Sequence, residues 1–446
     1  MPLPRLPEKK GEGSMKRLLK GADILAWEKD DFVCLKNGYL GIDGDRIDYI
    51  GAEPPREAYD ETKDMTGKLL LPGLINGHTH TGMSLLRGLG SDLPLQNWLF
   101  DTIFPVEDRL TDKDLRIGME LSLLEMLASG TTSFTDMYMS PGYTAQSVLD
   151  AGMKANLCRP LQSFDPSEDP MTCRRMQEML ALYDRWNGAG DGRITVDFSI
   201  HAEYTCTERM VRAAAEEAQK RGAGMHIHLS ETAAEQQNCI DKYDLTPAQW
   251  FDKLGAFSGR AYAAHCVWLT PEDRALLKAR SVVPIHCPES NLKLGSGVAD
   301  VPAMVREGLT VALGTDGAAS NNNLNMFEEM HLAALLHKGV QHDPTALPIG
   351  EVLKMATVNG AKLQGRTDTG VLAVGKKADV IAVDMDRPHL TPCIDPLSNL
   401  LYSAQAADVV LTMADGRILY ENGEFLTLDR ERILFEARQA GRRLLP

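Results

Sequence analysis

The stretch LLLPGLINGHTH, residues 69–80, begins as an apolar run and ends on two histidines. An apolar run of this kind predicts a buried strand. In a strand, residues i and i+2 point to the same face, so the side chains of His78 and His80 can converge on one ion. A single H-x-H pair does not establish a metal site. Its meaning depends on what stands at the ends of the other apolar runs.

Seven further apolar runs follow, and segments with the helical spacing of apolar residues separate most of them. The eight expected strands are Leu69–Ile75, Thr132–Thr135, Ala155–Leu157, Thr195–Ile200, Gly224–Leu229, Tyr262–His265, Ser281–Ile285 and Thr310–Leu313. The expected helices include Asp114–Ala128 and Glu208–Lys220, the second with Thr207 as a candidate N-cap. Strands and helices that alternate over about 300 residues predict an α/β fold of the (β/α)₈ barrel type.

The two ends of the chain have a different, β-rich pattern. Short strand-like runs occur at Arg17–Leu25, Gly38–Ile42, Arg46–Ile50, Ala378–Val383, Val409–Met413 and Ile418–Tyr420. We expect residues 15–70 and 369–446 to form one small β-sandwich domain, and residues 71–368 to form the catalytic barrel. Residues 1–14 are rich in proline and charge and lack the apolar segment of a secretory signal. They are expected to be a disordered extension or a leader.

Composition and charge restrict the function classes. The chain has 446 residues, 43% of them hydrophobic, which is enough for a large core and a smaller domain. Its net charge of −15 argues against nucleic acid as a partner, because phosphate backbones are bound by basic surfaces. No apolar run reaches the roughly 18 residues of a membrane helix. The eight cysteines form no C-x-x-C pair, so we expect a cytoplasmic location.

Histidine or aspartate stands at the end of many of the expected strands. Besides the pair at 78 and 80, these residues are His201, His228, His265, His286 and Asp316. The active sites of (β/α)₈ barrels lie at this face. His265, at the end of the sixth strand, fits a metal ligand, a base beside an activated water, or a buried hydrogen-bonded histidine.

We expect His78, His80, a third histidine and Asp316 to hold one metal ion. The third histidine is His226 or His228, which share a strand face, and we choose His228 because it lies nearer the end of the strand. Three imidazoles and one carboxylate suit Zn²⁺ with an open position for water, and Fe²⁺ or another divalent ion also fits. Asp316 has an alternative role as the cap of the following helix.

Five motifs together resemble the amidohydrolase superfamily. They are PGLINGHTH (72–80), HLSE (228–231), HC (265–266), HCPESNLKL (286–294) and GTDGAASNN (314–322). The chain looks most like the branch of 5′-methylthioadenosine/S-adenosylhomocysteine deaminases, from about Lys16 to the C-terminus. The resemblance implies a distorted (β/α)₈ barrel with one divalent metal ion per subunit, flanked by a β-sandwich that both chain ends form.

The resemblance also implies the chemical role of each residue. The residues that match the metal ligands are His78, His80, His228 and Asp316. Glu231 and His265 match the residues that handle protons, with Asp316 as a further acceptor. Glu231 is expected to carry a proton to the purine ring nitrogen while water attacks C6 and ammonia leaves. The spacing of three residues between His228 and Glu231 favours a heteroaromatic C–N bond as the target.

Substrate contacts follow from the same resemblance. Trp98 and Glu107 match positions that contact the base edge and the ribose hydroxyls, and His201 matches another substrate contact. Arg159 and Arg175 resemble arginines that meet the carboxylate of an S-adenosylhomocysteine-type tail. Arg159 would come from a neighbouring subunit, which implies a homo-oligomer. From the pattern alone, these residues also fit a core tryptophan, a solvated carboxylate and surface charges.

Ser320, four residues after Asp316, is expected to orient the ligand set. Two positions depart from the pattern, since Cys287 stands where many relatives have Asn, and Glu203 where many have Pro. The implied activity is hydrolysis of the 6-amino group of an adenosine-type nucleoside, with no nucleic acid and no membrane as partner. The alternatives are a guanine, pterin or s-triazine substrate within the same superfamily, and a non-catalytic barrel that acts as a binding module.

Overall fold

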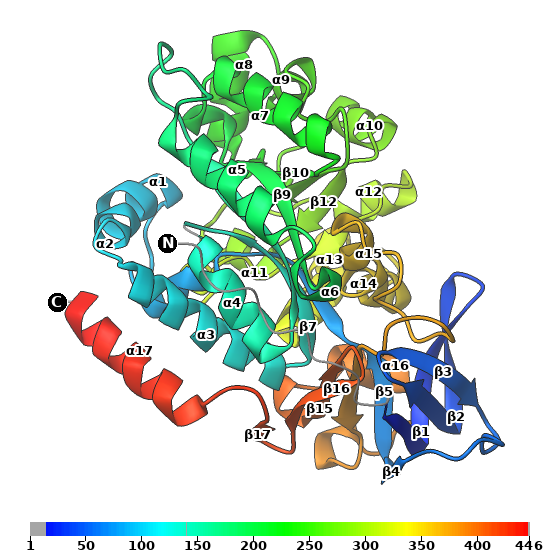
Figure 1. Cartoon of the computed structure of the whole chain (residues 1–446). Coiled ribbons are helices and arrows are strands. Elements are labelled where there is room, and N and C mark those ends of the chain that lie inside the picture. The colour runs from blue at the N-terminus through cyan, green and yellow to red at the C-terminus, as the bar shows by residue number, and fades with distance from the viewer. Residues whose placement is uncertain (1–14, 140, 445–446) are drawn as a thin grey trace.

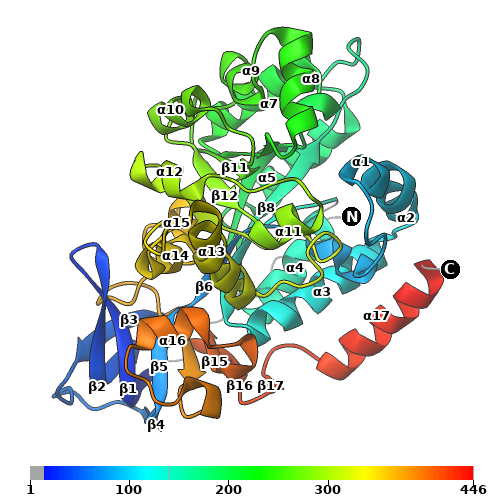
Figure 2. The ribbon, with the colours of Figure 1, turned by 180° about the vertical axis from the view of Figure 1, so that it is seen from behind.

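The computed structural model describes residues 15–139 and 141–444, which form an eight-stranded sheet surrounded by helices and a separate nine-stranded sheet (Figure 1). The predicted extension at residues 1–14 lies outside the described residues. Figure 2 shows the same arrangement from behind, with the blue and orange strands of the two chain ends side by side below the barrel. Within the described part of the chain, no helix combines the length and the apolar character needed to cross a bilayer.

Eight parallel strands form the barrel, each hydrogen-bonded to its neighbours in sequence order. They are β6 (Leu74–Thr79), β7 (Thr131–Met137), β8 (Lys154–Leu161), β9 (Ile194–Ile200), β10 (Met225–Leu229), β11 (Ala261–His265), β12 (Val283–His286) and β13 (Ala312–Leu313). Almost every residue of these strands is buried, as both faces of a parallel barrel are covered. The prediction of a (β/α)₈ barrel is confirmed.

Helices alternate with the barrel strands and surround them (Figure 1). The helices up to β10 are α1 (Leu95–Asn97), α2 (Phe104–Glu107), α3 (Asp112–Ala128), α4 (Pro141–Ala151), α5 (Arg174–Trp186), α6 (Ala189–Gly192) and α7 (Glu208–Arg221). Those after β10 are α8 (Ala233–Tyr243), α9 (Pro247–Lys253), α10 (Pro271–Ala279), α11 (Pro288–Lys293), α12 (Val301–Arg306), α13 (Met326–Gln341), α14 (Ile349–Met355), α15 (Val358–Leu363), α16 (Pro396–Tyr402) and α17 (Arg430–Leu444). Short 3₁₀ helices span Thr81–Leu86, Glu203–Thr205, Pro388–Leu390 and Ala406–Asp408, and a π-helical turn spans Trp98–Ile103.

Two expected helices form, and their first residues are capped by threonine. Thr207 accepts a hydrogen bond from the Met210 backbone N–H at 3.3 Å, which confirms it as the N-cap of α7. α3 begins two residues before the predicted start. There, Thr111 accepts from the Asp114 N–H and donates its own N–H to the Asp114 carboxylate, a reciprocal capping box.

The run Leu69–Ile75, predicted as one strand, is two. β5 (Lys68–Pro72) belongs to the second sheet, and β6 of the barrel begins at Leu74. Pro72 has no N–H to continue a ladder, and the Gly73 N–H instead donates to the Asp379 carbonyl at 3.0 Å. The prediction of a single strand over this stretch was therefore wrong, although all eight barrel strands form.

Both chain ends contribute to the second sheet, which has nine strands and is mostly antiparallel. Its strands are β1 (Lys16–Glu28), β2 (Asp31–Asp43), β3 (Arg46–Gly51), β4 (Glu61–Asp64), β5, β14 (Val380–Asp384), β15 (Val409–Ala414), β16 (Arg417–Glu421) and β17 (Glu424–Phe425). The sheet curls around its own apolar core, so that the β15–β16 turn meets the β2–β3 turn. At this contact Arg17 Nη1 donates to the Gly416 carbonyl at 2.7 Å, and a Cβ on Gly416 would lie 2.0 Å from the Gly44 carbonyl oxygen.

The barrel closes where the first and last strands meet, directly below the predicted metal ligands. The Asp316 N–H donates to the His78 carbonyl at 3.0 Å. A Cβ on Gly314 would lie 2.7 Å from the His78 backbone nitrogen, and one on Gly77 would lie 2.9 Å from the Leu313 carbonyl oxygen. Glycine at both positions lets the two strand ends approach each other, which brings His78 and Asp316 together.

Candidate active site

A cavity of about 320 Å³ opens at the carboxyl ends of the barrel strands, a volume typical of sites for small organic ligands. It brings together all the predicted site residues except His78, which is buried beneath its floor. The predicted residues in its lining are His80, Trp98, Glu107, Arg159, Arg175, His201, His228, Glu231, His265, Asp316 and Ser320.

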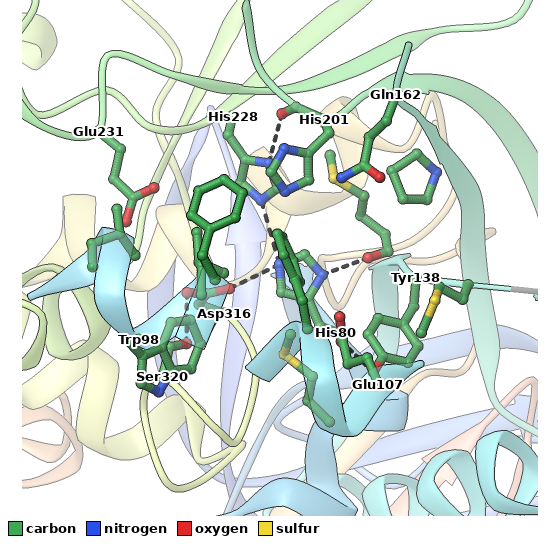
Figure 3. Close-up of a pocket in the computed structure, with 18 of the residues that line it drawn as sticks. His80, Trp98, Glu107, Tyr138, Gln162, His201, His228, Glu231, Asp316 and Ser320 are labelled. Carbon is green, nitrogen blue, oxygen red and sulfur yellow. Dashed lines mark hydrogen bonds and ion pairs between the residues drawn. The ribbon is translucent and has the colours of Figure 1, made fainter. Parts of the chain in front are cut away.

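The rings of His80 and His228 are oriented by backbone carbonyls. His80 Nδ1 lies 2.5 Å from the Met137 carbonyl oxygen, and His228 Nδ1 lies 2.7 Å from that of His201. Because a carbonyl only accepts, both Nδ1 atoms carry a proton, and Nε2 is the atom that each ring presents to a cation. These two Nε2 atoms are 3.3 Å apart and face each other (Figure 3).

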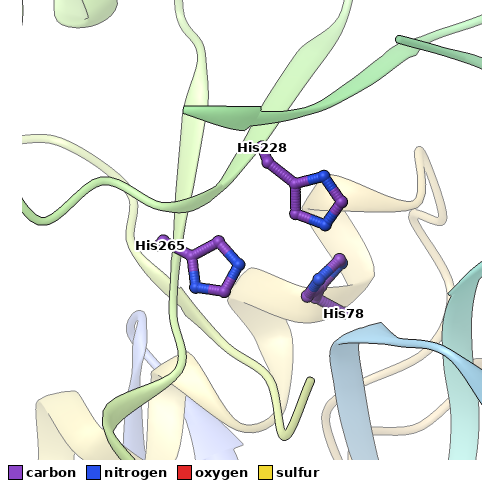
Figure 4. Close-up of side chains that lie close together, drawn as sticks. All are labelled: His78, His228 and His265. Atoms are coloured by element: carbon purple, nitrogen blue, oxygen red, sulfur yellow. The ribbon is translucent and has the colours of Figure 1, made fainter. Parts of the chain in front are cut away.

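His226, the alternative third ligand, lies behind His78 and not beside the cavity. Its Nε2 is 3.1 Å from His78 Nδ1, and its ring packs against Tyr262. His78 therefore also presents its Nε2 to the group, and this atom has no hydrogen-bond partner. The ligand-type nitrogens of His78, His228 and His265 lie within 4.8 Å of one another, and Figure 4 shows the three rings facing a common point.

Asp316 completes the group with one carboxylate oxygen. Its Oδ1 is 3.3 Å from His78 Nε2 and 3.1 Å from His80 Nε2. Its Oδ2 accepts hydrogen bonds from the hydroxyls of Ser290 and Ser320, both at 2.7 Å. The two serines fix the plane of the carboxylate and leave Oδ1 directed at the histidines.

These residues fit a divalent cation. Burial lowers the pKa of His78 to about 4 and holds that of His228 well below its usual value, so both rings are neutral, the form that binds metal. Three imidazole nitrogens and one carboxylate oxygen are a common donor set for Zn²⁺ and similar ions, and the buried His78 Nε2 has no hydrogen-bond partner.

Glu231 and His265 lie side by side next to this group. His265 Nε2 is 3.8 Å from Glu231 Oε2, and His265 Nδ1 is 2.9 Å from the side-chain oxygen of Asn291. The Ser296 hydroxyl donates to Glu231 Oε1 at 3.4 Å. Burial raises the pKa of Glu231 above its usual value, which favours the protonated carboxyl. This is the property of a general acid.

Left-handed backbone occurs at three residues that aim these side chains. Their φ angles are +49° at Ser230, +72° at His265 and +62° at Asp316. Such conformations are uncommon for residues other than glycine and persist where the surrounding structure holds them. Each follows or ends a barrel strand, so the strand ends turn sharply and direct the functional groups into the cavity.

Glu107 and Trp98 occupy another part of the wall. The Tyr138 hydroxyl donates to Glu107 Oε1 at 2.6 Å, and burial raises the pKa of Glu107 to about 7. The Trp98 indole N–H donates to the Leu89 carbonyl at 3.2 Å. Trp98 therefore offers its ring to a ligand, because its only donor is already engaged.

The two predicted arginines differ in how their charge is balanced. Arg159 Nε donates to Glu178 at 2.9 Å, whereas Arg175 makes one long contact, at 3.4 Å, with the Gln162 carbonyl. Arg159 lines the cavity of its own chain, whereas the family resemblance led us to expect an arginine from a neighbouring subunit at this position. Its position therefore gives no argument for a second subunit.

Three other positions named from the sequence are the half-buried His201 and the buried Glu203 and Cys287. His201 Nδ1 lies 3.1 Å from the Thr205 hydroxyl, and burial lowers the pKa of His201 to about 3. Glu203 and Cys287, where the chain departs from the family pattern, are 3% and 0% exposed. Glu203 thus places a buried carboxyl where many relatives have Pro. A buried carboxyl needs a hydrogen-bonding or charged neighbour, because burial without one is costly.

The sequence prediction missed Asp136, Tyr138 and Ser290. Asp136 Oδ1 accepts the Thr81 N–H at 2.8 Å directly behind His80. Asp136 and Tyr138 stand at the end of β7, so the same search for polar residues at strand ends could have found them. Ser290 had no such signal, because its contact with Asp316 depends on the fold of the loop after β12.

A model of the amidohydrolase family matches residues 69–419. The chain belongs to the amidohydrolase family. Among members in other organisms, a 5-methylthioadenosine/S-adenosylhomocysteine deaminase of Acetivibrio thermocellus is 45% identical over 97% of this chain and 100% of its own length. A 5′-deoxyadenosine deaminase of Methanosarcina acetivorans is 44% identical over 96% of this chain and 98% of its own.

A solved amidohydrolase has the same fold over nearly the whole length. The crystal structure of an adenosine deaminase from Xanthomonas campestris with bound zinc superposes with a TM-score of 0.91 at 31% identity, covering 97% of this chain and 99% of the other. The predicted resemblance to the methylthioadenosine/S-adenosylhomocysteine deaminase branch is confirmed. The prediction that the chain is a hydrolytic deaminase is confirmed as well.

Proposed function

We propose that this amidohydrolase removes the 6-amino group of an adenosine with a modified 5′ position, such as 5′-methylthioadenosine or S-adenosylhomocysteine, and releases ammonia. The observation that carries the proposal is the placing of two acids in one cavity. The buried Glu231 faces His265 on one side, and Glu107 with Tyr138 lies on the other, with His80 and Asp316 between them (Figure 3). The names of the two 44–45% identical relatives support an adenosine-type substrate.

His78, His80, His228 and Asp316 would hold one divalent ion in this proposal. Zinc is our first choice, supported by the zinc in the Xanthomonas campestris adenosine deaminase structure, and Fe²⁺ is the alternative. When bound, such an ion acts as a Lewis acid and lowers the pKa of coordinated water from about 15.7 toward about 7.

The residues of the chain then handle the protons. As the water oxygen adds to C6, one of its two protons goes to the His265–Asp316 pair, which borders the same point. Glu231 delivers its own proton to the adjacent ring nitrogen, where negative charge would otherwise collect. The proton stored on the His265–Asp316 pair passes to the exocyclic nitrogen, which leaves as ammonia, and the remaining hydroxyl proton returns to Glu231 as C6 becomes a carbonyl carbon. Asn291 keeps the His265 ring oriented throughout, through its contact with Nδ1.

Residues of the outer cavity wall recognise the ribose and the 5′ substituent of the substrate in this proposal. In this proposal the Glu107 carboxylate, which accepts a hydrogen bond from Tyr138, also accepts the ribose hydroxyls, the ring of Trp98 contacts the base, and His201 contacts the sugar. Arg175 is available for an anionic 5′ tail because no carboxylate balances it within hydrogen-bond distance among the described residues. Arg159 contributes less, since Glu178 neutralises it.

Three broader predictions belong to the same proposal. We propose residues 71–368 as the catalytic barrel domain, and 15–70 with 369–446 as the second domain. All eight cysteines are free thiols, which supports a cytoplasmic location. A homo-oligomer remains a prediction from the family resemblance, and light scattering of the purified protein tests it.

Ammonia release decides among the candidate substrates. The purified enzyme is incubated with 5′-methylthioadenosine, S-adenosylhomocysteine, adenosine, 5′-deoxyadenosine, guanine and an s-triazine. We expect release from the 5′-modified adenosines. Activity confined to guanine or the triazine overturns the substrate, and the absence of both activity and metal favours a binding module.

Glu231→Gln tests the chemistry separately from the substrate. The amide cannot deliver a proton, so kcat falls by about 10²–10⁴-fold. Metal content stays at the wild-type level, because Glu231 is not among the proposed ligands. An active Glu231→Gln enzyme refutes the proton-carrying role of this residue, while leaving the fold and the metal site untouched.

A further inference from the structure

A second buried glutamate lies directly behind Glu231. Glu235 stands in the first turn of α8, and both of its carboxylate oxygens accept backbone hydrogen bonds. Oε1 accepts the Ser230 N–H at 2.8 Å, and Oε2 accepts the Glu231 N–H at 2.7 Å. The Glu235 N–H in turn donates to the Thr232 hydroxyl at 3.1 Å. The side chain is 7% exposed and does not line the cavity.

These two hydrogen bonds hold the turn that aims Glu231. Ser230 adopts a φ of +49°, a conformation that costs a residue with a Cβ and needs support from its surroundings. A carboxylate that bridges two successive N–H groups supplies this support, because charge-assisted hydrogen bonds are roughly twice as strong as neutral ones. Without it, the backbone at Ser230 has no other partner for its N–H among the described residues.

The same turn also supports the loop that follows His265. The Ser230 carbonyl accepts the N–H groups of Val267 and Trp268, at 3.1 and 2.9 Å. His265 and Cys266 themselves have left-handed φ angles, +72° and +50°. The Ser230 carbonyl thus ties this turn to the residues after His265, while His265 itself is held at the end of β11.

Glu203 completes the arrangement as a neighbour of Glu235. It comes from the 3₁₀ helix after β9 and is 3% exposed. Burial and the adjacent Glu235 carboxylate raise the pKa of Glu203, so this acid keeps its proton and can donate it to Glu235 in a hydrogen bond. Burial and the neighbouring Glu231 carboxyl raise the pKa of Glu235 to about 7, and its two backbone N–H partners oppose the rise, so Glu235 is the more acidic member of the pair.

We propose that Glu235, supported by Glu203, is a positioning residue that fixes the Ser230–Glu231 backbone so that the Glu231 carboxyl faces His265 and the cavity. The inference rests on the proposed role of Glu231 in deamination. It assigns a task in the reaction to two acids that touch neither substrate nor the candidate metal ligands.

Kinetics of Glu235→Gln test the assignment. The glutamine side chain can accept a hydrogen bond from only one of the two backbone N–H groups, because its NH₂ is a donor and faces the other N–H. One of the two hydrogen bonds that hold the turn is therefore lost. We expect kcat to fall about 100-fold, as for a misplacement near 1 Å, while KM stays within about threefold. Metal content stays at the wild-type level. The matched control is Glu216→Gln, an exposed glutamate on α7, which should keep full activity.

A double variant separates positioning from general stability. If Glu235 acts through Glu231, then Glu231→Gln with Glu235→Gln is no more than about threefold slower than Glu231→Gln alone. Multiplied losses, or a Glu235→Gln enzyme within about threefold of wild type, overturn the inference.

Two further variants serve where Glu235→Gln does not fold. Glu203→Gln keeps a donor for Glu235 and should remain within about threefold of wild-type kcat, while Glu203→Val removes the donor and should lower kcat about tenfold at unchanged KM. Equal kcat in both overturns the inference.

A crystal structure of the Glu235→Gln variant gives a readout that needs no activity. Unchanged orientation of Glu231 and of the Ser230 backbone refutes the positioning role, whatever the substrate. Failure of the wild-type enzyme to release ammonia from any adenosine refutes the proposed function instead.

Discussion

Replacing Tyr138 by Phe removes one hydroxyl and tests whether Glu107 is a ribose-binding carboxylate. The Tyr138 hydroxyl donates to Glu107 Oε1 at 2.6 Å at the wall of the cavity. Burial raises the pKa of Glu107 to about 7, and this hydrogen bond opposes the rise. The ionised carboxylate is the form that accepts the ribose hydroxyls. Loss of the bond favours the protonated form, so the active fraction at neutral pH falls.

The size of the effect follows from the strength of the bond. A hydrogen bond to a charged group contributes about 1.5–3 kcal/mol, and about 1.4 kcal/mol corresponds to one pH unit. The pKa of Glu107 therefore moves upward by about 1–2 pH units in the variant. At pH 7 the ionised fraction drops from about one half to between roughly one-tenth and one-hundredth. We expect kcat/KM at pH 7 to fall about 5- to 50-fold.

The assay is kcat/KM for 5′-methylthioadenosine between pH 5.5 and 9.5, since this ratio reports ionisations of the free enzyme. The acid limb of the profile should move to higher pH, and the variant should regain activity above about pH 9. Tyr143→Phe, at a tyrosine 59% exposed on α4, is the matched control and should keep the wild-type profile. A loss that is equal at every pH, or an acid limb at the wild-type position, refutes the reasoning.

Two other substitutions probe the remaining parts of the site. Ser320→Ala removes one of the two hydroxyls on Asp316 Oδ2, so affinity for the divalent ion should fall about 10- to 100-fold in a chelator competition; unchanged metal affinity contradicts the ligand-orienting role. Arg175→Ala removes the cation without a balancing carboxylate, so kcat/KM for S-adenosylhomocysteine should fall about 10- to 100-fold while 5′-deoxyadenosine changes less than about threefold. Equal losses on both nucleosides would mean that Arg175 acts on folding and not on the tail.

The barrel could be predicted because parallel strands buried on both faces appear as continuous apolar runs. The run Met225–Leu229 and the histidine at its end illustrate this, since β10 has the predicted limits within one residue. The error at Leu69–Ile75 arose because Pro72-Gly73 breaks the hydrogen-bond ladder without interrupting the apolar pattern. An apolar run does not show that its first part pairs in one sheet and its second part in another.

Side-chain pairing was less predictable than strand position. His226 and His228 are equivalent by strand periodicity, so the choice of His228 rested on its place nearer the strand end; in the structure His226 contacts His78 Nδ1 and His228 lines the cavity. The ion pair of Arg159 with Glu178, on the helix after β8, likewise had no signal in the sequence. These contacts depend on loop paths and ring orientations, which periodicity does not encode.

Metal titration of the metal-free enzyme measures most directly whether one divalent cation is required. Protein stripped with a chelator is titrated with Zn²⁺, and bound metal and ammonia release are measured on the same samples. Activity should be absent without metal, rise in proportion to bound Zn²⁺ and saturate at one ion per chain, and His228→Ala should not recover it. Full activity in the metal-free protein, or saturation only at two ions per chain, would contradict a single ion held by His78, His80, His228 and Asp316.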